Sequence, residues 1–233
     1  MDIVVFGANG QTGRLLTRRA LDKGHSVVAV TRHPDDFPFA DTRLTLAKAD
    51  VREPSSSLGE AVRDTDAVVS TLGVPFSTRP IDTYSVGVRN VVDAMRSTGV
   101  RRLVVVSSTG AYHYPNRRDT PFALRVAEPV ITRTIGKTTY DDQRRMEDIV
   151  RVSGLDWTVV RPSGLFDLKE PTNYLAGEVD PIGGFTARID LADYMIALAG
   201  DLSTVGKTVV VSTTENTPTM WQMIRREAFK SAS

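Results

Sequence analysis

The sequence predicts an α/β fold built on a doubly wound, parallel sheet. Three observations predict it. Short apolar runs alternate with longer segments of helical periodicity from the first residues onward. The run Leu103–Ser107 is dominated by valine, which is typical of a strand covered on both faces. Right-handed connections between parallel strands need a helix between them, so this alternation favours a parallel sheet.

The N-terminal residues are expected to form a strand–helix–strand unit. Ile3–Phe6 is an apolar run that predicts the first buried strand. A helical pattern follows over Thr12–Lys23, and Gly24 gives it a C-terminal stop. Ser26–Val30 then predicts the second strand.

The next segment repeats this order twice. Arg43–Ala47 is expected as the third strand and Ser57–Arg63 as a short helix. Ala67–Thr71 predicts the fourth strand, and Tyr84–Thr98 predicts a helix that ends at Gly99.

The C-terminal elements follow the valine-rich fifth strand. Asp141–Val152 is expected as a helix stopped by Gly154, and Trp157–Val160 as the sixth strand. Val205–Val211 predicts a seventh strand, and Met220–Phe229 a terminal helix. The apolar stripe of that helix favours docking on the sheet over a contact between copies, and the oligomeric state stays open.

Two stretches lack a regular pattern. Residues Tyr112–Thr139 hold three prolines and several arginines, and we expect a small lid or short helices over a site there. The alternative is a surface connection without function. Residues Gly164–Arg188 are expected to form the opposite wall. No linker or repeat divides the chain, so we expect one domain over residues 1–233.

Composition and charge exclude several classes of protein. The 29 Lys and Arg against 28 Asp and Glu leave a net charge of +1, too balanced for a protein that coats nucleic acid or an anionic membrane. Cysteine is absent, which excludes disulfide scaffolds and thiolate chemistry, and three separated histidines predict no metal centre. The N-terminus goes directly into a strand without a signal-peptide pattern, so we expect a cytoplasmic location.

A glycine-rich loop follows the first strand and opens the first helix. It reads Gly7-Ala8-Asn9-Gly10-Gln11-Thr12-Gly13, with glycine at every third position. Glycines permit the tight turn and the approach of the backbone to a pyrophosphate, which the helix N-terminus then attracts. The loop predicts a dinucleotide site, the alternative being one of the glycine turns common after strands. Its candidate binding residues are Gly7, Asn9, Gly10, Gln11, Thr12 and Gly13.

The end of the second strand bears on the choice of dinucleotide. An acidic residue there suits the ribose hydroxyl of NAD, and an arginine suits the 2′-phosphate of NADP. Arg32 offers a planar, permanently charged fork and His33 could assist it, so we favour NADP. Asp35 and Asp36 could instead cap the next turn, or turn back onto the ribose and restore NAD as a candidate.

Several motifs together resemble a known family. In order they are Phe6–Gly13, Thr31-Arg32, Ala49-Asp50-Val51, Val69–Gly73, Gly87–Val92, Asp141–Met146 and Ser153–Trp157. Over essentially its whole length the chain resembles the atypical short-chain dehydrogenase/reductase superfamily, and within it the small NAD(P)H-binding members of the biliverdin-IX-beta reductase and flavin reductase type. The resemblance implies a Rossmann-like fold and a single NAD(P)-binding domain.

The resemblance also implies positions around the cofactor. Asp50 and Val51 would border the adenine, although Asp50 could simply cap its loop. Leu72 and Gly73 would lie beside the adenosine phosphate. By the same resemblance, further residues would flank the nicotinamide: Ser107, Ser108, Arg161, Pro162 and Ser163.

The proton donor is an open question in the sequence. Many members of the superfamily use a Tyr with a Lys four residues later and a Ser on the preceding strand. Ser108 matches the serine, and Tyr140 with Arg144 has the spacing, but arginine cannot shuttle a proton. If Glu147 marks the register instead, Thr139 and Gln143 occupy the dyad positions. Tyr140 is thus a candidate catalyst or a surface residue at a helix start.

The absence of the usual Tyr–Lys dyad fits a reductase whose acceptor takes hydride readily, such as a flavin, a quinone-like compound or a linear tetrapyrrole. We therefore expect a reductase that uses NADPH, with a small-molecule acceptor such as a flavin as substrate. The rings of Tyr112, His113 and Tyr114 could stack a planar acceptor, and Arg117, Arg118 or Arg125 could meet its carboxylates or phosphate. Alternatively the rings pack under the lid and the arginines are solvated.

Two other functions compete with a reductase. A non-catalytic sensor of the NADP redox state, signalling through a protein partner, is favoured by the missing dyad. A nucleotide-sugar epimerase or dehydratase is weakened by the missing dyad and by a C-terminal region too short for a sugar-binding domain. We expect neither a nucleic acid nor a membrane as partner.

Overall fold

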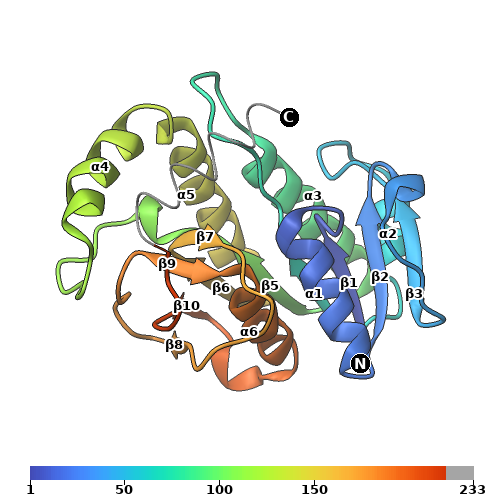
Figure 1. Cartoon of the computed structure of the whole chain (residues 1–233). Coiled ribbons are helices and arrows are strands. Elements are labelled where there is room, and N and C mark those ends of the chain that lie inside the picture. Colours follow the sequence, from blue (N-terminus) through green and yellow to red (C-terminus); the bar gives the residue numbers. More distant parts are fainter. Residues whose placement is uncertain (219–233) are drawn as a thin grey trace.

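The computed structural model describes residues 1–218 of the chain. Its centre is an eight-stranded sheet in the order β3-β2-β1-β4-β5-β6-β10-β8 (Figure 1). The strands are β1 (Asp2–Phe6), β2 (Ser26–Thr31), β3 (Leu44–Lys48), β4 (Ala67–Ser70), β5 (Arg102–Val106), β6 (Asp156–Pro162), β8 (Leu175–Gly177) and β10 (Lys207–Ser212). Neighbouring strands from β3 to β10 pair in parallel, and β8 runs antiparallel to β10 at the edge. The predicted doubly wound, Rossmann-like α/β fold is confirmed.

Helices cover both faces of this sheet. They are α1 (Gln11–Asp22), α2 (Ser56–Val62), α3 (Thr83–Thr98), α5 (Lys137–Arg151) and α6 (Arg188–Gly200). Ile3 and Val5 of β1 pack with α1 and α6, whereas Val4 and Phe6 pack with α2, α3 and α5. Alternate residues of one strand therefore enter two separate cores, which is why the strand sequences read as continuous apolar runs.

One buried arginine closes the amino edge of the sheet. Arg102, at the start of β5, is 4% exposed. Its guanidinium donates hydrogen bonds to the carbonyl oxygen of Leu198 near the end of α6 (2.6 Å) and to that of Asp156 at the start of β6 (2.8 Å). The Leu198 carbonyl oxygen also accepts the N–H of Asp201 (3.1 Å), so Arg102 adds a second hydrogen bond to a carbonyl group of the last turn of α6.

The expected strands and helices up to β10 each overlap an observed one, with shifts at their ends. The largest shift is at α5, which begins at Lys137 rather than Asp141. The predicted terminal helix Met220–Phe229 lies outside the described residues. Within residues 1–218, no helix combines the length and apolar character needed to cross a bilayer.

The two stretches expected to be irregular hold regular elements. The first contains α4 (Phe122–Arg133), with Pro129 inside it. The second contains β7 (Gly164–Phe166) and β9 (Phe185–Ala187), which pair with each other, and the edge strand β8. The helix that follows, α6, was missed by the sequence analysis. Most of its residues are buried, so its sequence lacks the polar face that reveals a helix.

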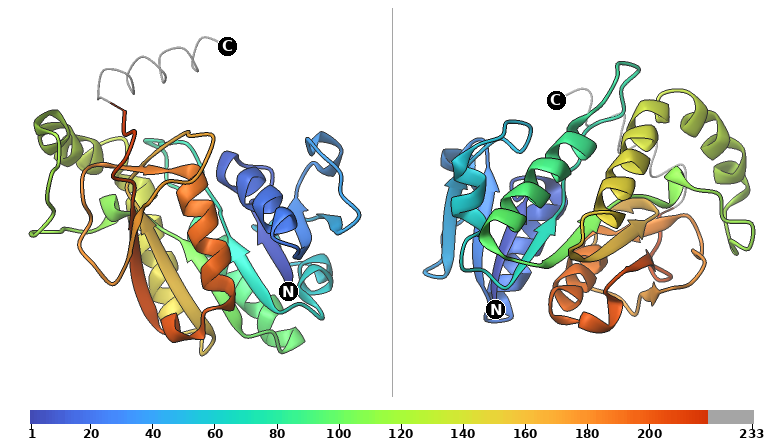
Figure 2. Two further views of the ribbon diagram at one scale, coloured as in Figure 1. Left: turned by 60° about the horizontal axis from the view of Figure 1, so that its bottom comes forward. Right: turned by 180° about the vertical axis from the view of Figure 1, so that it is seen from behind.

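Helix α4 belongs to the segment that we call the lid, residues 112–136. The lid lies at the end of the molecule opposite β3, on the outer side of α5 (Figure 2). Within the described chain, none of the residues of α4 is buried, and Phe122 is 80% exposed. Among residues 1–218 the lid shares no buried apolar core with the body; it is attached by polar contacts and by single apolar contacts such as that of Leu124 with Gly184.

Candidate active site

A glycine turn joins β1 to α1 at the carboxyl edge of the sheet. Gly7 has φ +76°, which side chains disfavour, and a Cβ there would lie 2.9 Å from the carbonyl carbon of Thr71. A Cβ on Gly13 would lie 2.2 Å from the carbonyl oxygen of Gly7. Only glycine therefore fits at these two positions.

The turn also lies where the sheet changes direction. The chain runs from β1 outward to β2 and β3 on one side, and continues with β4, β5 and β6 on the other (Figure 1). Open α/β sheets bind ligands in the crevice at this topological switch point.

The N-terminus of α1 is suited to an anion. Gly10 precedes the helix, and in the described part of the chain no side chain caps this end and no acidic residue lies in its first turn. Its amide groups and helix dipole therefore attract negative charge. Asn9 accepts a hydrogen bond from Arg14 (2.9 Å), which holds a cation beside the turn. Thr12 is buried and Gln11 is exposed, and the whole turn fits a pyrophosphate.

The ends of β2 and β3 bring together the residues expected at the adenosine. Arg32 is exposed, and its Nη1 lies 4.0 Å from Oδ2 of Asp50. Asp50 also accepts a hydrogen bond from the N–H of Arg52 (2.9 Å), so it caps its own loop as well. Val51 is buried, and its carbonyl oxygen accepts a hydrogen bond from Asn90 of α3 (2.8 Å). This loop is therefore fixed by α3.

The ends of β4, β5 and β6 supply the residues expected nearer the nicotinamide. Leu72 is buried and Gly73 exposed after β4, and Pro162 is buried at the end of β6. Ser107 follows β5 and is 4% exposed, and its Oγ has no hydrogen-bond partner among residues 1–218. A buried hydroxyl without a partner costs free energy, so this atom fits a ligand that would pair with it.

The structure brings Ser108 and Tyr140 together. The Tyr140 hydroxyl lies so close to Gly110 that a Cβ there would be 2.6 Å away. Ser108 Oγ in turn accepts a hydrogen bond from the N–H of Gly110 (3.1 Å). Burial, together with the carboxylate of Glu128, raises the pKa of Tyr140 to about 12. Tyr140 is therefore a protonated phenol at neutral pH.

The two registers considered for the dyad lie on different faces of α5. Arg144, four residues after Tyr140, donates to the carbonyl oxygen of Ala111 (2.5 Å) and pairs with Asp141. Its guanidinium is thus engaged in holding the turn after β5. Thr139 and Gln143 are buried on the neighbouring face, each with one oxygen unpartnered in the described residues. Of the four residues in these two registers, Tyr140 is the one placed with Ser108, since both lie beside Gly110.

The aromatic residues of the lid pack around an arginine. The Arg161 guanidinium lies 3.4 Å from the ring centroid of Tyr112 and donates to the hydroxyl of Tyr114 (3.1 Å). It also pairs with the fully buried Glu147 (2.6 Å). Burial lowers the pKa of Arg161, but the Glu147 carboxylate outweighs that effect and raises it above its usual value. These two rings are thus held in the wall, whereas His113 is exposed.

The three lid arginines have different environments. Arg118 and Arg125 are exposed. Arg117 instead makes a two-pronged ion pair with Glu128 of α4, with both Nη1–O distances 2.9 Å, and its Nε donates to the carbonyl oxygen of Gly183 (2.8 Å). Of the two alternatives left open by the sequence, solvated lid arginines therefore do not describe Arg117, whose side chain is 11% exposed.

The sequence analysis did not find Glu128 as the partner of Arg117, nor Glu147 as the partner of Arg161. A weak signal for the first existed, because Glu128 is the one acidic residue in the helix Phe122–Arg133. Nothing in the sequence spacing relates Arg161 to Tyr112, since the sheet brings these residues together from separate segments.

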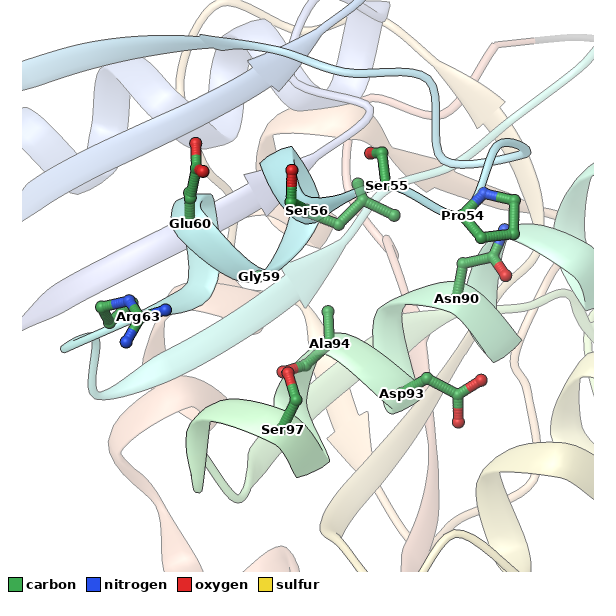
Figure 3. Close-up of a pocket in the computed structure, with 11 residues that line it drawn as sticks. Pro54, Ser55, Ser56, Gly59, Glu60, Arg63, Asn90, Asp93, Ala94 and Ser97 are labelled. Carbon is green, nitrogen blue, oxygen red and sulfur yellow. The ribbon is translucent and has the colours of Figure 1, made fainter.

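A separate open hollow of about 410 Å³ lies on the flank of the molecule, between α2 and α3 (Figure 3). Ser55, Glu60, Arg63 and Ser97 are among its lining residues, and Asn90, which holds the Val51 loop, lies at its rim. The glycine turn and the Ser108–Tyr140 pair are not part of its lining. The carboxyl edge, and not this hollow, gathers the candidate residues.

The glycine turn and the residues after it match a family model. The model, described as NAD(P)H-binding, covers residues 7–201. The chain belongs to this NAD(P)H-binding family. The resemblance inferred from the motifs is confirmed at that level.

Two curated relatives illustrate the range of the match. The UPF0659 protein C216.03 of Schizosaccharomyces pombe is 30% identical over 232 residues, covering 92% of this chain and 90% of that protein. Cinnamoyl-CoA reductase 1 of Petunia hybrida is 36% identical over 127 residues. That second match covers 49% of this chain and spans only 38% of the petunia protein.

Solved structures share the fold at low identity. A short-chain dehydrogenase/reductase of Veillonella parvula in complex with NADP superposes with a TM-score of 0.74 at 20% identity, covering 92% of this chain and 95% of that one. ChuY, an anaerobillin reductase from Escherichia coli O157:H7, superposes with a TM-score of 0.70 at 21% identity, covering 94% of this chain and 100% of that one. Family membership and fold together identify an NAD(P)H-binding protein with a Rossmann-like fold.

Proposed function

We propose that this protein is an NADPH-dependent reductase that transfers hydride to a small, planar aromatic acceptor such as a flavin, a quinone-like compound or a linear tetrapyrrole. The observation that carries the proposal is the placement of two sites at one edge of the sheet. The anion-binding turn of α1 lies at the end of β1, and Ser108 and Tyr140, which both lie beside Gly110, are beyond the end of β5. NADP in a structural neighbour and the reductase name of another support it.

The bound dinucleotide would supply the hydride, and the residues of the chain would bind and orient the reactants. The loop from Gly7 to Gly13 would hold the pyrophosphate, and Ser107 would donate its unpaired hydroxyl to the nicotinamide end. Tyr140, protonated at neutral pH, would donate a hydrogen bond or a proton to the acceptor, with Ser108 orienting it.

Arg32 supports the choice of NADP over NAD. It lies exposed at the end of β2, next to Asp50, where a 2′-phosphate would come within reach of its fork. Asp35 and Asp36, the alternative ribose ligands, form the short turn Pro34–Asp36 just beyond it. Their charge disfavours a phosphate, so Arg32 has to outweigh them.

The direct test is oxidation of NADPH by the purified protein with FMN as acceptor, beside NADH and a control without protein. Steady turnover that prefers NADPH supports the proposal. Turnover with NADH alone contradicts the role of Arg32, and no turnover with flavin, quinone and tetrapyrrole acceptors contradicts the reductase.

The engagement of Arg144 favours one second candidate, a non-catalytic sensor of the NADP redox state. Its guanidinium is committed to Ala111 and Asp141, so no lysine-like group assists Tyr140 at this position. Tight binding that distinguishes NADPH from NADP⁺, without turnover of any acceptor, would support the sensor.

A further inference from the structure

The Arg117–Glu128 pair lies inside the wall of the candidate active site. The side chain of Arg117 is 11% exposed and that of Glu128 is 29% exposed. Nη1 of Arg117 donates to both carboxylate oxygens of Glu128, and Nε donates to the carbonyl oxygen of Gly183. A guanidinium held in this way therefore offers Nη1 as a receptor for any carboxylate or phosphate that takes the place of Glu128.

Hydroxyl groups connect this receptor to the site of reduction. Nη2 of Arg117 lies 3.4 Å from Oγ of Ser163, which follows β6. Ser163 Oγ lies 3.2 Å from Oγ1 of Thr109, the residue after Ser108. The carboxylate of Glu128 raises the pKa of Tyr140 and the guanidinium of Arg117 lowers it, so both charges lie within electrostatic range of the phenol.

Glu128 is carried by an element with little hold on the protein body. In the described residues, α4 contributes no buried side chain and leaves Phe122, Val126 and Val130 exposed on one side. Displacing such a helix costs little compared with displacing an element of the core. Arg117, in contrast, has a second hydrogen bond, to the carbonyl oxygen of Gly183, that does not involve Glu128.

We propose that Arg117 binds the anionic group of the acceptor, and that Glu128 occupies Arg117 when no acceptor is bound. Glu128 is then a specificity-determining residue, since every anionic acceptor has to displace it. A neutral acceptor gains nothing from the exchange. This inference rests on the proposed reductase function and names the class of acceptor, a planar molecule with a carboxylate or phosphate group.

The test uses two flavins that share one ring system. FMN carries a phosphate and riboflavin carries none, so the ratio of their affinities isolates the anionic contact. Dissociation constants are measured by flavin fluorescence in the protein saturated with NADP⁺, and KM values by oxidation of NADPH. The variants are Glu128→Gln and Arg117→Gln, singly and together, with Asp119→Asn as control. Asp119 is an exposed acid of the same lid, with a φ of +54° that asparagine tolerates.

Glu128→Gln should lower the dissociation constant and the KM for FMN by about tenfold, because the competing charge-assisted pair is removed. Riboflavin should be unaffected, and Asp119→Asn should change neither flavin. The gain should vanish in the double variant, since the receptor itself is then absent.

Three results would overturn the inference. The first is a Glu128→Gln protein that binds both flavins equally worse, because the pair then only clamps the lid. The second is an unchanged ratio of FMN to riboflavin, and the third is no detectable FMN binding by either the wild type or Glu128→Gln. If the wild type binds FMN without reducing it, the reductase proposal fails while the binding ratio still decides the role of Glu128.

Discussion

The two halves of the candidate site are built in different ways. On the dinucleotide side, the geometry comes from the backbone: Gly7 and Gly13 pack against neighbouring main chain with no room for a Cβ. On the acceptor side, it comes from side-chain pairs such as Arg117 with Glu128 and Arg161 with Glu147. The comparison teaches that the first half binds what any dinucleotide shares, whereas the second half can change its preference through single side chains.

The largest effect should come from the backbone of the dinucleotide side. Gly13→Ala places a Cβ within 2.2 Å of the Gly7 carbonyl, which α1 can relieve only by moving away from β1. We expect NADPH affinity to fall by about 100-fold or more, since the amides of the first turn move with it. Titration by NADPH fluorescence measures this. Gly59→Ala in α2, where a Cβ would meet its nearest atom at 3.8 Å, is the matched control and should bind normally.

The next largest effect, on the free energy of unfolding, should come from Arg161 on the acceptor side. Arg161→Met leaves the fully buried Glu147 with Arg151 as its one remaining ionic partner among residues 1–218, and removes the support of Tyr112 and Tyr114. We expect about 3 kcal/mol of lost stability, measured by urea unfolding.

Arg101→Met provides the control for Arg161→Met, because its ion pair with Asp156 is exposed and should contribute far less to stability. A similar loss in the two variants would break the distinction between buried and exposed pairs. If Arg161→Met raises KM for FMN while the NADPH affinity stays normal, the acceptor side can be changed without affecting the dinucleotide side.

A smaller effect, on the affinity for NADPH, is expected from Arg32 at the edge of the dinucleotide side. Arg32→Ala removes the fork beside Asp50 but leaves the glycine turn intact. We expect the dissociation constant of NADPH to rise by about tenfold to 30-fold, and that of NADH to stay within about twofold. Equal losses for both cofactors would show that Arg32 supports the fold of the loop rather than the phosphate.

The smallest effect should be seen at Tyr140. Its pKa of about 12 keeps the phenol protonated, so its ionisation should not affect kcat between about pH 7 and pH 10. Tyr140→Phe should lower kcat with FMN by less than about tenfold, because a flavin ring needs little help from a protein acid. An alkaline loss of activity in this range that disappears in Tyr140→Phe would contradict the assigned protonation state.

The contrast between backbone constraints and side-chain pairs also explains which parts of the fold and site could be predicted from the sequence. The glycine turn could be predicted because a backbone constraint leaves its trace in residue type, and glycine is the only residue that satisfies it. The strands could be predicted because burial on both faces demands unbroken apolar runs, as in β5. Helix α6 could not, because a helix buried nearly all round loses the polar face that marks its period.

The acceptor half was harder to predict because its contacts join distant segments. Ser108 and Tyr140 were named from a family pattern, and the structure brings them together. The sequence left the register of the dyad open, since Thr139 and Tyr140 are neighbours and only the orientation of α5 separates them. The partners of Arg117 and Arg161 depend on where β6 and α4 lie, which no local pattern encodes.

The buried Arg102 shows that the two ends of the strands have different roles. At the amino ends of β5 and β6 one side chain ties the sheet to the last turn of α6, far from the candidate chemistry. At the carboxyl ends the same strands carry the loops that meet ligands. Because the anchor and the reactive loops sit at opposite ends, substitutions that retune the chemistry leave the anchor untouched. A scaffold arranged in this way can be re-engineered toward new acceptors by changing the loops alone.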